Sequence, residues 1–246
     1  MSPAPSGGIR VAFFGGSFDP PHLGHLAIAQ AARRKLSLDK VLFAPVGLQP
    51  LKPAGSSASF EHRVAMTRLA IATQPGFELS LLDAPSPDSD DPDHAVPNYT
   101  IDTLSRLKQS LPAGARLDLL IGADSFRTIR QWHRAAEIPF LASLIVASRP
   151  GEDLTDLASF LPAGIAIQPV PHQPDRYRLL NPSGDESDLL ILPDLNYDIS
   201  ATQLRKQIQG KPSNQTPLLD PAVLQYIHHH HLYESALSRP PATNHC

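Results

Sequence analysis

Residues 10–36, RVAFFGGSFDPPHLGHLAIAQAARRKL, indicate how this chain folds. The segment begins with a short apolar run that stops at Gly15 and Gly16, as a buried strand does. From Leu23 onward, apolar residues recur at helical spacing. A strand joined to a helix by a tight glycine loop is typical of a βαβ unit, and such units build parallel sheets.

The same alternation continues along the chain. Further strands are expected at 40–46, 77–82, 116–121, 143–147, 165–170 and 189–192. Helices are expected at 59–73 with Ser59 as the cap, then at 100–110, 125–130, 133–138, 154–161, 200–209 and 221–231. Short connections and right-handed crossovers then favour an α/β fold, a Rossmann-like, doubly wound and mainly parallel sheet with helices on both faces.

Length and composition limit the domain organisation. With 246 residues, 41% of them hydrophobic, the chain can build the core of one large α/β domain. We expect a single domain at 10–233, between flexible tails at 1–9 and 234–246. Two polar, proline-rich stretches interrupt the pattern: 84–98, expected to be a mobile surface insert, and 168–188, which could hold a hairpin.

Charge and cysteine content exclude several classes of protein. The net charge of −3 and the pI near 6.4 argue against non-specific nucleic-acid binding. The single cysteine, Cys246, cannot form an internal disulfide, which predicts a reducing compartment, the cytoplasm. No apolar run approaches the roughly 18 residues of a membrane span. The N-terminus also lacks the apolar region of a secretory signal.

The loop at 15–25 has the features of an anion site. Gly15 and Gly16 allow a sharp turn, and Pro21 suits a first helical position. The following helix N-terminus would offer free N–H groups and a positive dipole end. His22 and His25, three residues apart, would share one helix face and donate to a phosphate, as in nucleotidyl transfer. The alternatives are a plain turn with surface histidines, or zinc binding, for which two ligands are too few.

A second segment, 198–205 (DISATQLR), also fits a phosphate site. Ser200 and Gln203 form the pattern of a capping box. The spare hydroxyl groups at this helix start, with Arg205 one turn further on, could also cradle a phosphate. The two interpretations are compatible.

Both segments resemble the signatures of the nucleotidyltransferase superfamily. His22 to His25 match (H/T)-x-G-H, and 199–205 match Ile-Ser-Ser-Thr-x-x-Arg with Ala201 in place of Ser. Neither segment is a dinucleotide-binding G-x-G-x-x-G loop or a P-loop. Within the superfamily, 10–233 resembles the bacterial nicotinate-mononucleotide adenylyltransferases. The matching pieces are 16–25, 60–63 with Met66, 98–104, 122–126 with Trp132, 148–151, 199–205, 226–227 and 232–233.

The resemblance implies that ATP binds across the first and last signatures, with Mg²⁺ accompanying it. The implied catalytic residues are His22, His25, Lys52 and Arg205. The implied ATP-binding residues are Gly15, Gly16, Ser17, Phe18, His22, Gly24, His25, Ile199, Ser200, Thr202 and Arg205. No protein-bound metal is expected.

The resemblance also implies where nicotinate mononucleotide binds. Trp132 offers a stacking face for the pyridine ring, and Tyr99 and Thr100 lie at a helix start that suits the carboxylate. Asp124, after a strand end, would contact a ribose hydroxyl. The full implied set is Lys52, Tyr99, Thr100, Gly122, Asp124, Trp132 and Arg149. The alternatives are core packing for Trp132 and a helix N-cap for Asp124.

The chain departs from the family pattern at 49–52, which reads QPLK. Leu51 replaces a usual histidine, and Gly47 replaces an asparagine that is common a few residues earlier. At this loop the mononucleotide would meet different side chains from those of the family pattern. Lys52 is therefore either a phosphate contact or an exposed loop lysine.

Two further tracts contain possible metal ligands but are not expected to bind a metal. The histidines at 228–231 lie on a predicted helix, so at most two share a face. The four aspartates within 88–93 could bind a hard cation, but a solvated insert explains them better.

The sequence thus predicts adenylyl transfer from ATP to nicotinate mononucleotide, giving deamido-NAD and pyrophosphate. Within the fold, nicotinamide mononucleotide, phosphopantetheine or glycerol phosphate could replace the acceptor. A protein of a different class, a non-catalytic nucleotide-sensing module, is the other alternative. We expect small-molecule partners, ATP and the mononucleotide, with no nucleic acid and no membrane. The oligomeric state is left open, a homo-oligomer included.

Overall fold

The computed structural model describes residues 8–51, 55–85, 97–148, 156–193, 200–210 and 218–234. Eight strands of these residues form one sheet in the order β3-β2-β1-β4-β5-β8-β7-β6. The strands from β3 to β8 in this order are parallel, and β7 and β6 are added antiparallel at one edge. The bounds are β1 Arg10–Gly16, β2 Lys40–Pro45, β3 Phe77–Leu79, β4 Arg116–Gly122, β5 Ser143–Ala147, β6 Ala166–Val170, β7 Gln173–Leu180 and β8 Glu186–Leu192.

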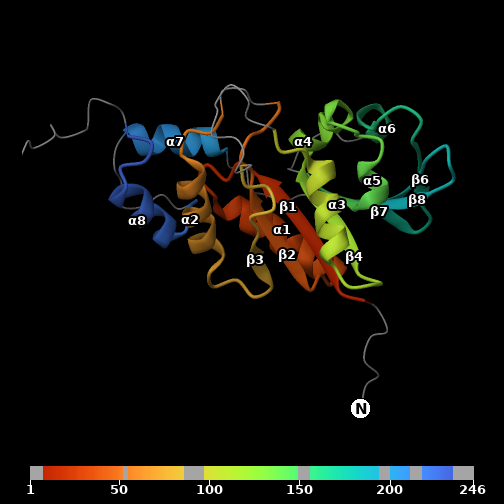
Figure 1. Cartoon of the computed structure of the whole chain (residues 1–246), viewed down its shortest axis with the longest axis horizontal. Helices are drawn as coiled ribbons and strands as arrows, with labels where there is room; N and C mark the ends of the chain where they lie inside the picture. Colours follow the sequence, from red (N-terminus) through yellow and green to blue (C-terminus); the bar gives the residue numbers. More distant parts are fainter. Residues whose placement is uncertain are drawn as a thin grey trace, which may run out of the picture.

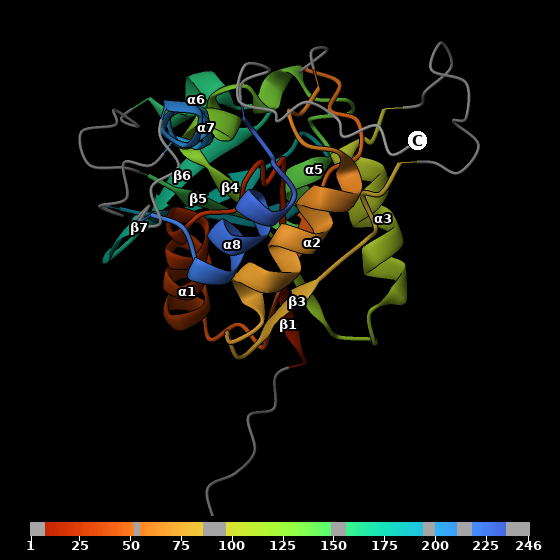
Figure 2. The same cartoon turned by 90° about the vertical axis from the view of Figure 1, so that its left-hand side faces the viewer.

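Helices cover both faces of this sheet (Figures 1 and 2). One face packs against α1 (Leu23–Leu36), α2 (Phe60–Ile71), α7 (Ala201–Gly210) and α8 (Pro221–His229). The other face packs against α3 (Thr100–Ser110), α4 (Ala123–Arg127), α5 (Ile138–Leu141), α6 (Leu157–Phe160) and a 3₁₀ turn at Ile129–Gln131. The doubly wound, mainly parallel α/β fold is confirmed.

Strand β1 shows why two cores form. Ala12 and Phe14 point to the core beneath α1 and α2, whereas Phe13, between them, points to the core beneath α3. Side chains alternate between faces along a strand, so a continuously apolar strand is buried on both sides. Centrally placed β1 and β4 are therefore rigid supports for the loops at their carboxyl ends.

The elements differ from the sequence predictions mainly at their ends. The predicted helix at 133–138 is wrong, because Arg134 has a φ of 50° and only α5 at Ile138–Leu141 is helical. The strand predicted at 77–82 ends at Leu79, and the helices predicted to reach 73 and 231 end at Ile71 and His229. The predicted hairpin within 168–188 exists as β6 and β7, which continue into β8.

Helix starts follow local capping chemistry where a cap is present. Ser59 caps α2 as predicted, accepting a hydrogen bond from the His62 N–H, and Asp220 caps α8 through the Ala222 N–H.

No helix in the described ranges is long and apolar enough to cross a bilayer. Most of the insert at 84–98, namely 86–96, lies outside the described residues.

Candidate active site

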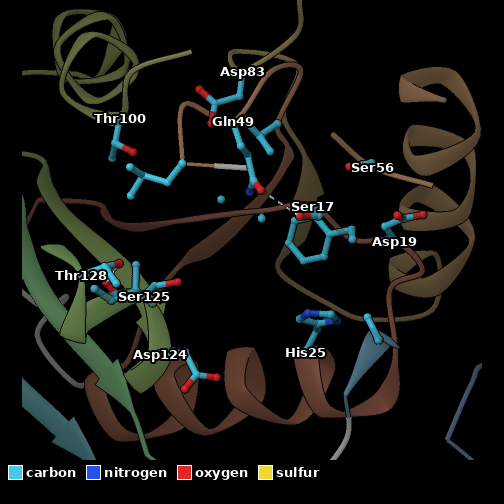
Figure 3. Close-up of a pocket in the computed structure, with 18 of the residues that line it drawn as sticks. Ser17, Asp19, His25, Gln49, Ser56, Asp83, Thr100, Asp124, Ser125 and Thr128 are labelled. Carbon is cyan, nitrogen blue, oxygen red and sulfur yellow. Dashed lines mark hydrogen bonds between the residues drawn. The ribbon is translucent and has the colours of Figure 1, made fainter. Parts of the chain in front are cut away.

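A cleft of about 860 Å³ lies at the carboxyl ends of the parallel strands, where open α/β sheets bind ligands (Figure 3). His25 and Ser17 line one side of it, and Thr100, Ser125 and Thr128 line the other. The lining comes from the loop after β1, the loop after β2, the segment before α3, the end of β4 and the start of α7. Segments far apart in the sequence therefore meet around one space.

The two glycines at the end of β1 lie close to neighbouring side chains. Gly16 still pairs with Pro45 of β2, and its carbonyl accepts a hydrogen bond from Val46 N–H at 3.0 Å. A Cβ on Gly15 would lie 3.0 Å from Cε1 of Phe13 and 3.6 Å from Oδ2 of Asp83. A side chain at Gly15 would therefore require the Phe13 ring to shift by a few tenths of an ångström.

The two predicted histidines form a stacked pair. Their ring centroids are 3.6 Å apart, with 23° between the ring planes. The backbone N–H of His22 donates to Nδ1 of His25 at 3.1 Å, so the proton of a neutral His25 ring sits on Nε2. The ring of Phe18 packs edge-on against His25, with centroids 5.0 Å apart. The pair is thus held as a unit at the start of α1, as the shared-face prediction requires.

The start of α1 corrects two details of the predicted anion site. His22 is the N-cap, so Pro21 precedes the helix and does not occupy its first position. The backbone N–H of Leu23 donates to the Leu218 carbonyl at 2.9 Å, and that of His22 is engaged by His25. These two N–H groups are therefore used within the protein. An anion bound here would therefore depend more on side chains than the helix start alone suggests.

Arg205 of α7 reaches the loop after β1. Its Nη1 donates to the Asp19 carbonyl at 2.7 Å and its Nη2 to Thr202 Oγ1 at 3.2 Å. Arg205, Thr202 and Ser200 line the same cleft as the histidine pair. Asp19 and Arg205 are 186 positions apart, so this hydrogen bond brings the segments of the two signatures together in space. Ile199 lies outside the described residues.

Asp19 organises this end of the cleft, a role that sequence reasoning missed. The buried carboxylate accepts hydrogen bonds from Ser57 N–H at 2.6 Å, Ala58 N–H at 3.1 Å and the Tyr233 hydroxyl at 2.7 Å. Burial raises the pKa of the Tyr233 phenol, with the neighbouring Asp19 adding to the effect. Asp19 and Tyr233 both lie inside matching family segments, which was the only signal available.

Arg63 supports the same loop from below. Its guanidinium donates to the Ser17 carbonyl at 2.8 Å and to the Ala58 carbonyl at 3.3 Å. The side chain is buried, and burial lowers the pKa of this guanidinium. Arg63 therefore acts on the cleft through the backbone of the loop.

The predicted mononucleotide residues line the opposite side. Tyr99 is the N-cap of α3 and Thr100 its first residue, as predicted. Gly122 and Trp132 line the same cleft. Trp132 also packs on the core beneath α3, as the core-packing interpretation expects, and its stacking on a pyridine ring stays a prediction. The N-cap interpretation of Asp124 is wrong, because Gly122 caps α4. Asp124 lies in the first turn and pairs with Arg127 at 3.4 Å.

The unusual loop after β2 is clamped by Asn98. Its Oδ1 accepts from Leu48 N–H at 2.9 Å, and its backbone N–H donates to the Leu48 carbonyl at 3.1 Å. A Cβ on Gly47 would lie 2.6 Å from Pro85 N, so the glycine departure fits this close packing. Gln49 Oε1 accepts from Ser17 Oγ at 3.2 Å (Figure 3). Lys52 and Arg149 lie outside the described residues.

Asp83 is a second cleft residue that sequence reasoning missed. Its carboxyl group lines the cleft and accepts a hydrogen bond from the Thr103 hydroxyl. Burial raises its pKa to about 6, against the opposing effects of Thr103 and Arg106. No feature of the Leu-Leu-Asp-Ala context distinguishes this residue in the sequence.

The histidine tract lies away from the cleft. His228 and His229 are in the last turn of α8, and Nδ1 of His62 lies 3.0 Å from the Tyr226 hydroxyl oxygen of the same helix. Over the described ranges, no group of three or more His, Cys, Asp or Glu side chains could hold a metal. The aspartate tract at 88–93 falls outside these ranges.

Known proteins share both the sequence and the architecture of this chain. Residues 13–207 match the cytidylyltransferase-like family. The chain is 37% identical over 226 residues to the probable nicotinate-nucleotide adenylyltransferase of Trichlorobacter lovleyi, covering 92% of this chain and 100% of that protein. It is 40% identical over 238 residues to the protein of the same name from Roseiflexus sp., covering 95% and 100%. The chain belongs to the nicotinate-nucleotide adenylyltransferase family.

Solved structures agree on the fold of this adenylyltransferase family. The nicotinic acid mononucleotide adenylyltransferase of Plasmodium falciparum complexed with NaAD matches with a TM-score of 0.66 and 17% identity, over 92% of this chain and 97% of that one. The structure of the same enzyme complexed with APC matches with a TM-score of 0.63 over the same shares. At this identity the likeness shows the fold.

Proposed function

We propose that this chain transfers the adenylyl group of ATP to nicotinate mononucleotide, producing deamido-NAD and pyrophosphate for NAD biosynthesis. One observation carries the proposal. The stacked histidine pair and Arg205 share a single cleft with Thr100 and Trp132, so a phosphate-binding end faces an end suited to an aromatic carboxylate. The curated relatives are named for this reaction.

In the proposed mechanism, the 5′-phosphate of the mononucleotide attacks the α-phosphorus of ATP. A new P–O bond forms there while the bond to the β-phosphate oxygen breaks, and pyrophosphate leaves with that electron pair. The nucleophile is already an anion, so no protein base is required. Catalysis is positioning and charge neutralisation, with Nε2–H of His25 donating to a phosphate oxygen and Arg205 holding the triphosphate.

The proposed roles divide the cleft between the two substrates. ATP lies over the glycine loop and the start of α7, against Gly15, Gly16, Ser17, Phe18, His22, Gly24, His25, Ser200, Thr202 and Arg205. The mononucleotide lies toward Tyr99, Thr100, Gly122, Asp124 and Trp132. The start of α3 supports this assignment, because the N–H groups and dipole of a helix N-terminus favour a carboxylate. Lys52, Arg149 and Ile199 stay predictions from the family resemblance.

ATP would enter as its magnesium complex. We expect this ion to be held by the phosphates and water. The ion would neutralise charge on the triphosphate. The single domain at 10–233, the flanking tails, the cytoplasmic location and the absence of nucleic-acid and membrane partners also stay predictions.

The test is pyrophosphate release from ATP and Mg²⁺, run in parallel with nicotinate and nicotinamide mononucleotide. We expect release with the acid and much weaker release with the amide, because Thr100 lies at a helix N-terminus. Equal release with both would keep the reaction and refute the carboxylate selectivity. ATP binding without release in either arm would contradict the proposal and favour the sensing module.

A further inference from the structure

The C-terminal segment touches the ATP end of the cleft through one hydroxyl group. Tyr233 lies 214 positions from Asp19, yet its hydroxyl donates to Oδ1 of Asp19 at 2.7 Å. The other bonds to this carboxylate come from the Ser57 and Ala58 N–H groups, at 2.6 and 3.1 Å. Three donors therefore hold a carboxylate that is 4% exposed.

The same carboxylate lies beside a cation that the proposed mechanism needs for ATP. Nη1 of Arg205 is 2.7 Å from the Asp19 backbone carbonyl and 3.8 Å from Oδ2 of the Asp19 side chain. The second distance is that of a long ion pair and exceeds hydrogen-bond range. Asp19 thus anchors Arg205 through its backbone, while its side chain is turned toward the loop and Tyr233.

We propose that Tyr233 is a positioning residue for ATP, which limits the contact between the Asp19 carboxylate and Arg205 to a long ion pair and so leaves the guanidinium available to the triphosphate. The inference rests on the proposed function, because it assigns Arg205 to ATP. Tyr233 itself does not touch the substrate in this account. It acts through Asp19 on the arginine.

The Tyr233 hydroxyl and the Arg205 guanidinium compete for one buried anion, the Asp19 carboxylate. A carboxylate oxygen that loses a donor in a buried site is costly, and it will recover a partner where one is near. Without the Tyr233 hydroxyl, Oδ1 of Asp19 would keep only the 3.1 Å bond from Ala58. The Arg205 guanidinium already forms a 3.8 Å ion pair with Oδ2. With its Oδ1 less constrained, the carboxylate could rotate and shorten this pair into a charge-assisted hydrogen bond. An arginine paired in this way binds a phosphate less tightly.

The experiment compares Tyr233→Phe with a matched control, Tyr226→Phe. Both changes remove one phenolic hydroxyl from the C-terminal region, but the Tyr226 hydroxyl contacts His62 and Tyr226 does not line the cleft. Affinity for a non-hydrolysable ATP analogue is measured by calorimetry, at a temperature well below the unfolding midpoint of both variants. We expect about tenfold weaker binding for Tyr233→Phe, the loss of roughly one charge-assisted interaction, and less than about twofold for Tyr226→Phe.

A second background shows whether the effect passes through Arg205. Tyr233→Phe is introduced into Arg205→Lys, where the planar guanidinium is absent, and should weaken analogue binding no further. In steady-state assays, Tyr233→Phe should raise KM for ATP and leave KM for the mononucleotide within about twofold.

Unchanged analogue affinity in Tyr233→Phe would overturn the inference. An equal loss in the Arg205→Lys background, or an equal loss in Tyr226→Phe, would overturn it as well, since each indicates a general structural effect. Analogue binding is measured without turnover. A wild-type protein that binds the analogue but releases no pyrophosphate would therefore contradict the proposed function and leave this test intact.

Discussion

Replacing Asp83 with Asn should stabilise the protein at neutral pH. The Asp83 side chain is 5% exposed, and burial raises its pKa from 3.8 to about 6. Its hydrogen bond from Thr103 and the charge of Arg106 only partly offset the cost of burying the carboxylate. Asparagine keeps an acceptor for Thr103 and removes the charge.

The size of the effect follows from the pKa difference between the folded and unfolded states. The pKa of Asp83 is about 6 in the folded protein and 3.8 without burial, so the folded protein holds this proton more tightly than the unfolded chain does. The stability that the wild type gains from binding this proton is therefore complete below pH 3.8 and is lost as the pH rises through about 6. The loss amounts to on the order of 3 kcal/mol in the free energy of unfolding.

The assay is urea unfolding of the wild type and Asp83→Asn at several pH values between 4 and 8. The stability of Asp83→Asn relative to the wild type should increase with pH and level off above about 6. Asp102→Asn, a change in an exposed aspartate on the same helix as Thr103, should show no such increase. A difference that does not vary with pH would refute the reasoning.

Two further changes test the sheet and the loop after β2. Arg10→Met should destabilise the fold by about 3 kcal/mol, because it leaves the buried Asp118 carboxylate without its bidentate partner at 2.7 and 2.8 Å. Chemical unfolding measures this loss, with Lys40→Met, which breaks an exposed pair with Glu78, as the control. A loss no larger than that of the control would contradict the prediction. Gly47→Ala should cost about 1–3 kcal/mol and raise KM for the mononucleotide, because its Cβ would lie 2.6 Å from a backbone nitrogen of the adjacent loop. Wild-type stability and KM in this variant would show that the loop is not tightly packed.

The parts of the fold that sequence predicted well are those with local causes. The run of β1 and the helix that begins at Leu23 follow from apolar periodicity and from the glycines between them. The helix predicted at 133–138 failed because Arg134 adopts a left-handed backbone conformation, which composition does not reveal. The N-cap interpretation of Asp124 failed because the cap of α4 is Gly122, two residues earlier in the chain.

The parts of the site that sequence missed depend on contacts between distant segments. The Leu218 carbonyl that engages the first turn of α1 and the Tyr233 hydroxyl that engages Asp19 both come from the far end of the chain. The raised pKa of Asp83 depends on burial that only the assembled cleft produces. Family resemblance marked some of these segments as significant, but it assigned no partner to Asp19 or Tyr233.

The most direct test of the central claim is identification of the dinucleotide product. Purified protein is incubated with ATP, Mg²⁺ and nicotinate mononucleotide. The products are then separated by chromatography and identified by mass spectrometry. We expect deamido-NAD and pyrophosphate in equal amounts from the wild type, and at least a hundredfold lower turnover from His25→Ala with an unchanged unfolding midpoint. A folded, ATP-binding wild type that forms no deamido-NAD, or a His25→Ala variant with near-normal turnover, would contradict the account.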